Sequence, residues 1–92
     1  MKKISEMTME ELEQARAERD ETRKFWLEFY TGWNRDNIRG CEIAIAKIDK
    51  EITVRKFSAE CAKRIEAGDI TQEQADAWIG LLKSQSIINF MK

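Results

Sequence analysis

Hydrophobic side chains recur along the middle of this chain at the alternating three- and four-residue spacing of an amphipathic helix. The pattern begins with Ile38, Cys41, Ile45, Ile48 and Ile52. It continues on a shifted face with Val54, Phe57, Cys61 and Ile65. The spacing predicts one long helix over about residues 36–67, with the first set of side chains forming a coiled-coil-like seam.

A β-hairpin is the alternative for part of this region. Residues 42–48 and 52–57 contain enough isoleucine, valine and phenylalanine for two short strands. The intervening residues Asp49, Lys50 and Glu51 include neither glycine nor asparagine, which a tight hairpin turn prefers. Alanine, lysine and glutamate between the isoleucines also suit a helix better than a strand. The helix is therefore the favoured interpretation.

Two capping boxes mark the start of the flanking helices. Thr8 stands three residues before Glu11, and Thr71 stands three residues before Gln74. These signals predict helices over about 9–31 and 72–90, with a flexible leader at 1–7. Gly68 fits the left-handed residue that closes the middle helix. The third helix is expected to turn four side chains inward: Ala75, Trp78, Ile79 and Leu82.

Three helices in 92 residues predict a single all-α domain spanning 1–92. The absence of proline and the presence of only four glycines agree with this fold class. A middle helix of this length would be about 46 Å long, more than a compact chain of this size can span. The chain is therefore either a small three-helix bundle with a bend near residues 52–54 or an elongated helical hairpin. In the elongated form the isoleucine seam would be covered by another chain, which makes a homo-oligomer a further expectation.

The residue types present argue against catalysis. The chain has no histidine, so it lacks the commonest general base and zinc ligand. Its four glycines are isolated and form no phosphate-binding loop. We expect no catalytic residues, no metal and no cofactor. Cys41 and Cys61 are read as free thiols of a reducing compartment, and no apolar run approaches the roughly 20 residues of a membrane span, so a cytoplasmic location without membrane contact is predicted.

Aromatic residues concentrate in residues 25–33, which hold five of the eight rings in the chain. Such rings are common both in small cores and at protein interfaces, where they bury a large area at little entropic cost. Because the predicted core is already filled largely by other side chains, the surplus rings are expected to face a partner. The predicted protein-binding residues are Trp26, Phe29, Tyr30, Trp33, Phe90 and Met91.

Basic residues in the middle helix leave one alternative function open. Residues 38–67 include seven lysines and arginines against five acidic residues. The glutamates interrupt the basic stripe that phosphate contacts require. The sequence therefore predicts a non-catalytic helical protein-interaction protein, an adaptor or inhibitor that binds a larger protein, with a small nucleic-acid-associated or transcription-regulating protein as the alternative.

Overall fold

A computed structural model describes residues 2–29 and 32–91 of the chain. The described residues form three α-helices and two short 3-10 helices, with no strand among them, so the all-α fold class is confirmed and the hairpin alternative is wrong. The elements in order are η1 (Ile4–Glu6), α1 (Met9–Glu28), α2 (Arg35–Glu66), α3 (Gln72–Ser84) and η2 (Ile87–Phe90).

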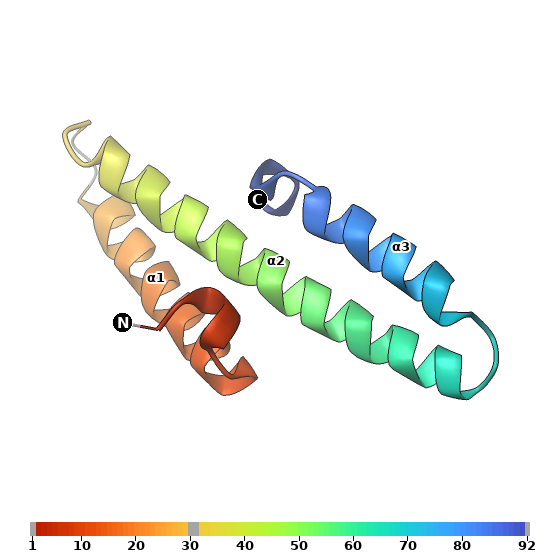
Figure 1. Ribbon diagram of the computed structural model, residues 1–92. Helices are drawn as coiled ribbons and strands as arrows, with labels where there is room; N and C mark the ends of the chain where they lie inside the picture. The colour runs from red at the N-terminus through yellow and green to blue at the C-terminus, as the bar shows by residue number, and fades with distance from the viewer. Residues whose placement is uncertain (1, 30–31, 92) are drawn as a thin grey trace.

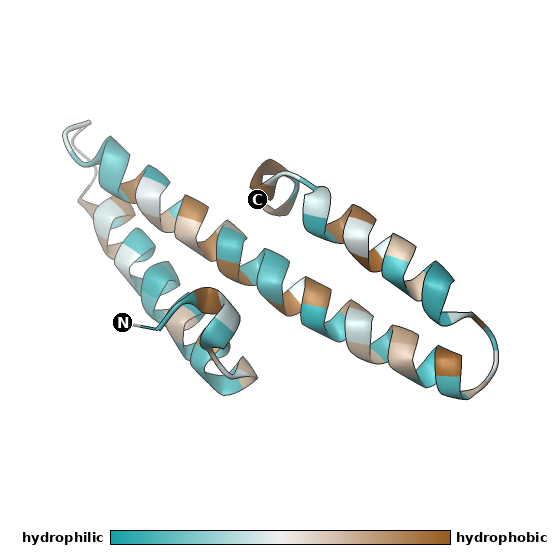
Figure 2. Cartoon of the chain, in the orientation of Figure 1, coloured by the Kyte–Doolittle hydropathy of each residue, from teal (hydrophilic) through white to brown (hydrophobic). Residues whose placement is uncertain are grey.

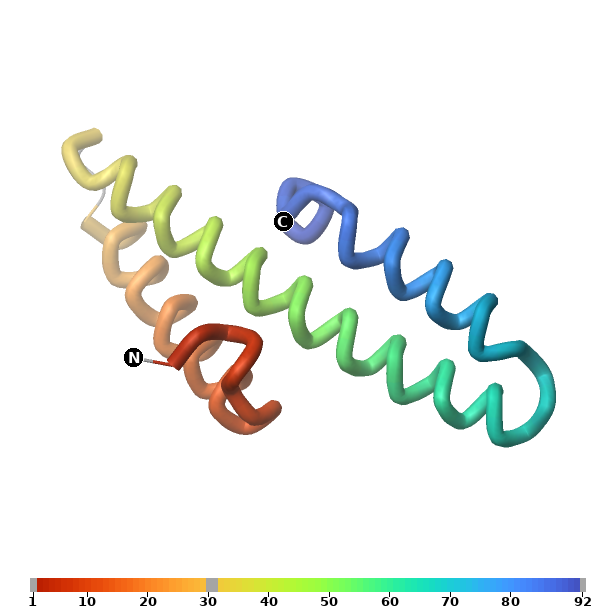
Figure 3. The backbone as a smooth tube through the Cα atoms, viewed as in Figure 1, coloured from red at the N-terminus to blue at the C-terminus, as the bar shows by residue number. Residues whose placement is uncertain are grey.

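The middle helix α2 is the spine of the molecule (Figure 1). Helix α1 packs along its N-terminal half and α3 along its C-terminal half, on opposite sides in this view. Both run antiparallel to α2. The chain measures 55 × 23 × 20 Å, and its radius of gyration is 16.4 Å, against about 12 Å for a compact domain of this length. Of the two predicted shapes, the elongated one is observed, and α2 continues through residues 52–54 as one rod (Figure 3).

Both predicted capping boxes are present. The Thr8 hydroxyl accepts a hydrogen bond from the Glu11 backbone at 3.1 Å, and the Glu11 carboxylate accepts one from the Thr8 backbone at 3.0 Å. Thr71 and Gln74 make the same reciprocal pair at the start of α3. Each box satisfies backbone donors that the first turn of a helix leaves without partners.

The turn from α2 to α3 is closed by backbone geometry. Gly68 has a φ of +82°, the left-handed conformation that a side chain disfavours. The Gly68 amide donates to the Ile65 carbonyl at 3.0 Å, and the Asp69 amide donates to the Arg64 carbonyl at 2.9 Å. This pair of bonds is the Schellman motif, as the glycine predicts.

The chain buries its isoleucine seam within itself. Ile38, Cys41 and Ile48 are buried on α2, the helix along which α1 packs. Ile45 and Ile52 are half-buried. Another chain is therefore not needed to cover this seam, contrary to the expectation for the elongated form.

Three sequence expectations require correction. Trp78 is 43% exposed, so it does not belong to the core. Helix α3 ends at Ser84 and not at 90, because Gln85 and Ser86 adopt extended backbone and the Ser86 hydroxyl caps η2. Helix α1 ends at Glu28, three residues before the predicted end.

The leader at 1–7 is tied to the helices where the structure describes it. It contains η1, whose Ile4 and Ser5 carbonyls accept hydrogen bonds from Arg55 of α2. Lys2 contacts both carboxylate oxygens of Glu11 at 3.0 Å. These contacts hold the segment across the α1–α2 pair, where the sequence predicts a flexible leader.

Candidate protein-binding surface

The end of the molecule where α1 meets α2 carries exposed aromatic side chains. Trp33 is 95% exposed, Phe29 is 56% exposed and Phe25 is 54% exposed. Leu27 is also exposed, and Trp26 is half-buried. We call Phe25, Trp26, Leu27, Phe29 and Trp33 the aromatic tip.

The Phe25 ring contacts two other rings of the aromatic tip. Phe25 lies edge-on to Trp26, with ring centroids 5.4 Å apart. Its centroid is also 5.2 Å from that of Phe29, one turn further along the chain. Such aromatic pairs stabilise their arrangement beyond the area they bury. Phe25, Trp26 and Phe29 therefore form a small cluster of rings at the end of α1, and Phe25, which lies outside the predicted set, is its central member.

Asn34 holds the tip against α2. It is the one buried polar residue in the described part of the chain, at 6% exposure. Its side-chain amide donates to the Trp26 and Phe29 carbonyls, at 3.0 Å in each case. The Trp26 carbonyl lies in the last turn of α1, and Phe29 is the residue that follows this helix. Asn34 is also the N-cap residue of α2, so a side chain at the start of α2 bonds the end of the preceding helix.

The predicted binding residues fall into two places. Trp26, Phe29 and Trp33 belong to the aromatic tip, and Tyr30 lies outside the described residues. Phe90 and Met91 lie instead beside the middle of α2, at the end of the chain that η2 folds back (Figure 2, where η2 is brown). Both line a cavity of about 110 Å³ to which no residue of the aromatic tip contributes. The structure therefore does not bring the two predicted groups together in this cavity.

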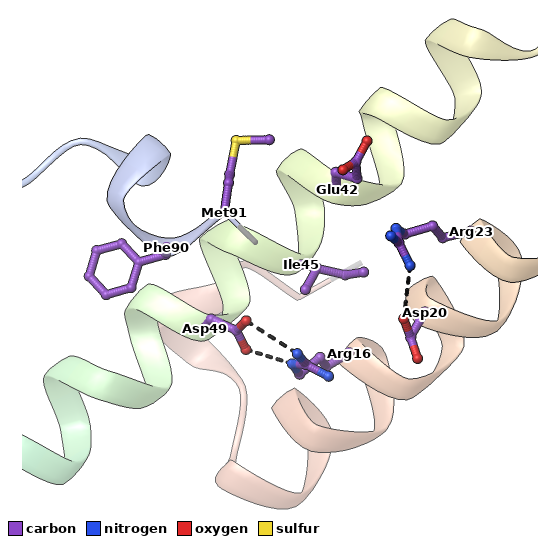
Figure 4. Close-up of a pocket in the computed structure, with 8 residues that line it drawn as sticks. All are labelled: Arg16, Asp20, Arg23, Glu42, Ile45, Asp49, Phe90 and Met91. Atoms are coloured by element: carbon purple, nitrogen blue, oxygen red, sulfur yellow. Dashed lines mark hydrogen bonds and ion pairs between the residues drawn. The ribbon is translucent and has the colours of Figure 1, made fainter. Parts of the chain in front are cut away.

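The cavity beside Phe90 and Met91 is surrounded by paired charges (Figure 4). Arg16 of α1 donates to Asp49 of α2 with a nitrogen–oxygen distance of 2.6 Å. This hydrogen bond raises the pKa of the Arg16 guanidinium above its already high ordinary value. Arg23 lies 3.8 Å from Asp20. Arg16 and Asp49 lie 33 residues apart in the sequence, and the packing of α1 on α2 brings them within reach of each other.

Three of the basic residues of α2 make contacts with other groups of the chain. Arg55 pairs with Glu51 at 3.0 Å, and Arg64 pairs with Glu60 at 3.3 Å, each across one turn of the helix. Lys50 donates to the Gln85 carbonyl, where α3 ends. These contacts spread the positive charge along the helix and reduce the number of basic groups available for phosphates.

The outer side of α3 is a surface that sequence reasoning missed. Leu81 is 66% exposed and Trp78, one turn earlier, is 43% exposed. The available signal was the width of the apolar pattern. Apolar side chains at 75, 78, 79, 81 and 82 cover more of a helix than a single neighbouring helix can bury.

The described residues contain neither a metal-binding cluster nor a membrane-spanning helix. No group of three or more acidic or cysteine side chains in residues 2–29 and 32–91 is arranged to hold a metal ion. Within the same ranges, no helix combines the length and the hydropathy of a membrane crossing. Neither finding identifies a function.

Comparison with protein families, with curated proteins and with solved structures finds no match for this chain. Its function is therefore argued from its own residues.

Proposed function

We propose that this chain is a non-catalytic helical protein that binds a larger protein through its aromatic tip. The observation that carries the proposal is the exposure of three large aromatic side chains, Trp33 at 95%, Phe29 at 56% and Phe25 at 54%, where α1 ends and α2 begins. Large apolar side chains that gather on a surface are typical of binding sites. Tryptophan and other aromatic residues dominate the energetics of such interfaces.

The position of the tip suits the role of an anchor. It lies at one end of a molecule 55 Å long, where a partner can surround it. The Asn34 amide fixes both carbonyls at the end of α1, so the rings of α1 are held on an ordered backbone. A preorganised anchor loses less entropy on binding than a mobile one. The partner expected from this shape is a protein with a concave apolar pocket.

The absence of catalysis is part of the proposal. The chain contains no histidine, and Asp49 and Asp20 beside its charged cavity are paired with arginines. Both cysteines are free and buried, which agrees with the reducing environment of the cytoplasm. We therefore include a cytoplasmic location in the proposal.

The test is the capture of a partner from host-cell extract by purified variants. Trp33→Ala is expected to weaken capture about thirtyfold or more while leaving the melting temperature unchanged, because its side chain is almost fully exposed. Ile88→Ala is the matched control, since it removes an exposed apolar side chain of η2, outside the aromatic tip.

Equal capture by Trp33→Ala and by the unmodified chain would contradict the proposal. Retention of the unmodified protein on DNA with a steep loss at higher salt would favour the nucleic-acid alternative instead. These outcomes separate the two functions because removing a neutral ring does not change the charge of the chain.

A further inference from the structure

The outer face of α3 is an uncharged, exposed helix surface. We define it by Ala77, Trp78, Gly80, Leu81 and Ser84, all of which are exposed. Between Asp76 and Lys83 the sequence contains no charged residue. A Cβ atom added at Gly80 would meet nothing within 4 Å, so the centre of this face is open.

Helix α3 uses its other side to pack on α2. Ala75 is buried, and Ile79 and Leu82 are half-buried. Ala77, Leu81 and Ser84 follow one another at helical spacing on the side turned away from these residues. In Figure 1, α3 lies at the edge of the molecule with only α2 alongside it. Nothing in the described part of the chain covers the outer face.

The chain exposes more surface than a compact monomer of its mass. Its accessible surface is 6899 Å², whereas a folded monomer of 10.8 kDa is expected to expose about 5,500 Å². The excess is about 1,400 Å² by this scaling. One partner in a standard protein interface buries about 800 Å². The elongated chain therefore has enough surplus surface to contribute one side of a stable interface.

We propose that the outer face of α3 packs against the same face of a second copy of this chain. The two α3 helices lie antiparallel, related by a two-fold axis that passes beside Gly80. A two-fold interface places a patch against itself, and an uncharged patch can do this without opposing like charges. The small residues Ala77, Gly80 and Ser84 allow close approach, and Leu81 of each copy lies near the axis.

The charged residues that flank the outer face support this arrangement. Asp76 and Lys83 are seven residues apart, which is close to two helical turns, so they lie along the same edge of the face. A two-fold axis beside Gly80 brings Asp76 of one copy to within about one residue of Lys83 in the other, an axial offset of about 1.5 Å. Each dimer would then contain two such pairs. Lys83 makes no ion pair within the described part of a single chain.

This inference does not rest on the proposed function, because the aromatic tip and the outer face share no residue. Sedimentation equilibrium of the full chain between 1 and 100 μM, on the order of usual dimer constants, is expected to report twice the monomer mass. Leu81→Asp is expected to weaken the dimer about thirtyfold or more, because it places two like charges near the axis. Leu27→Asp is the control, since it changes an exposed leucine of the aromatic tip, and its dimer constant should not change.

Charge exchange tests the antiparallel register. Asp76→Lys and Lys83→Asp should each weaken the dimer about two- to tenfold, as expected for ion pairs at an interface rim. The double variant, with both substitutions in one chain, should restore it because each pair is re-formed with its charges exchanged. Residues 76 and 83 are too far apart on one helix to contact each other, so recovery would not arise within a chain.

The outcomes that would overturn the proposal are specific. A monomer at every concentration would do so, as would a dimer that Leu81→Asp leaves intact or that Leu27→Asp dissociates. If the double charge variant were weaker than both single variants, the antiparallel register would be wrong. Circular dichroism of each variant checks that the helices remain, and if Leu81→Asp lowers the helix content, Leu81→Gln replaces it with the same expected loss of dimer.

Discussion

Helices α1 and α3 both pack on α2, but they differ in the polarity of their surfaces. Each begins with a capping box and packs antiparallel on α2. Helix α1 is mostly polar along its length and α3 carries more apolar residues (Figure 2). Leu12 is the one buried residue of α1, and Ala75 is the one buried residue of α3, both helices being fully described. The larger buried side chain therefore belongs to the more polar helix.

The difference shows in the surface that each helix leaves outside. The outward residues of α1 are largely charged, and Asp20 pairs with Lys24 at 3.2 Å. The outward residues of α3 from 77 to 82 are uncharged and include the exposed Trp78 and Leu81. A charged helix surface is stable in water, whereas an exposed apolar one is typical of a contact surface. The N-terminal half of the molecule therefore has its apolar surface concentrated at the tip, and the C-terminal half has it along a helix face.

Truncation of Leu12 should have the largest effect on stability. Leu12 is completely buried, so Leu12→Ala removes its apolar contacts and leaves a cavity, at a cost of about 3 kcal/mol. Leu81→Ala, at an exposed site of α3, should change the unfolding free energy by less than about 0.5 kcal/mol. Urea denaturation at low protein concentration measures both. Equal losses of unfolding free energy in the two variants would contradict the difference in burial between these positions of α1 and α3.

Removal of the Asn34 side chain should come next. Asn34→Ala leaves the Trp26 and Phe29 carbonyls without its two hydrogen bonds, at a cost of about 2 kcal/mol. The control is Asn37→Ala, at an exposed position of α2, which should be close to neutral. Thermal unfolding followed by circular dichroism gives both values. A neutral Asn34→Ala would show that the side chain does not hold the turn between α1 and α2.

The turn between α2 and α3 should depend on its glycine. Gly68→Ala forces a side chain into a φ of +82°, which costs about 1–2 kcal/mol. Gly40→Ala is the matched control, because Gly40 lies within α2 with open space around an added Cβ. That change should stabilise the chain by about 0.5–1 kcal/mol. In chemical denaturation, Gly68→Ala should lower the free energy of unfolding and Gly40→Ala should raise it. A decrease for both variants would contradict this prediction.

The ion pair between α1 and α2 should contribute about 1 kcal/mol, less than a fully buried pair because Arg16 retains a third of its side-chain exposure. A double-mutant cycle with Arg16→Ala and Asp49→Ala measures this coupling directly. Lys24 and Asp20 form an exposed pair within α1, and their cycle should give a smaller coupling. A larger value for the exposed pair would contradict the importance of the contact between helices.

The smallest expected effect is a difference in how the stability contributed by the two capping boxes depends on pH. The hydrogen bond from the Thr8 backbone amide lowers the pKa of Glu11 below its ordinary value of 4.5, and the hydrogen bond from Lys2 is the next largest cause. A carboxylate whose pKa is lower in the folded state than in the unfolded state stabilises the fold at a pH above its unfolded-state pKa. This contribution is lost as the pH falls through the folded-state pKa. The stability advantage over Glu11→Gln should therefore be constant near neutral pH and decrease below about 4.5.

The box at the start of α3 provides the comparison for this titration. Gln74 occupies the place of Glu11 and does not titrate in this range. The difference in stability between the unmodified chain and Thr71→Ala should therefore be the same at pH 3 and pH 6, to within about 0.3 kcal/mol. An equal loss at both boxes on acidification would assign the effect to some other carboxylate.

The local signals in the sequence were sufficient for the helices and their starts. The hydroxyl and the carboxylate or amide of each capping box lie three residues apart, so their hydrogen bonds depend on local backbone geometry alone. The same applies to Gly68 and to the ion pairs of Glu51 with Arg55 and Glu60 with Arg64. The sequence predicts too late an end for α3, because apolar residues continue through 87–91 after the backbone has left the helix at Gln85.

Which apolar residues are covered depends on how the helices are arranged in space. The isoleucine pattern of α2 is compatible with packing against α1 and with packing against another chain. The spacing of apolar residues defines the face of a helix that is buried, but it does not identify what covers that face. Trp78 has the helical spacing of a core residue, but α3 presents it to solvent because α2 lies along only one side of that helix. Arg16 likewise reaches Asp49, 33 residues away. Helix formation depends on neighbours in the sequence, whereas burial depends on how whole helices are arranged around α2.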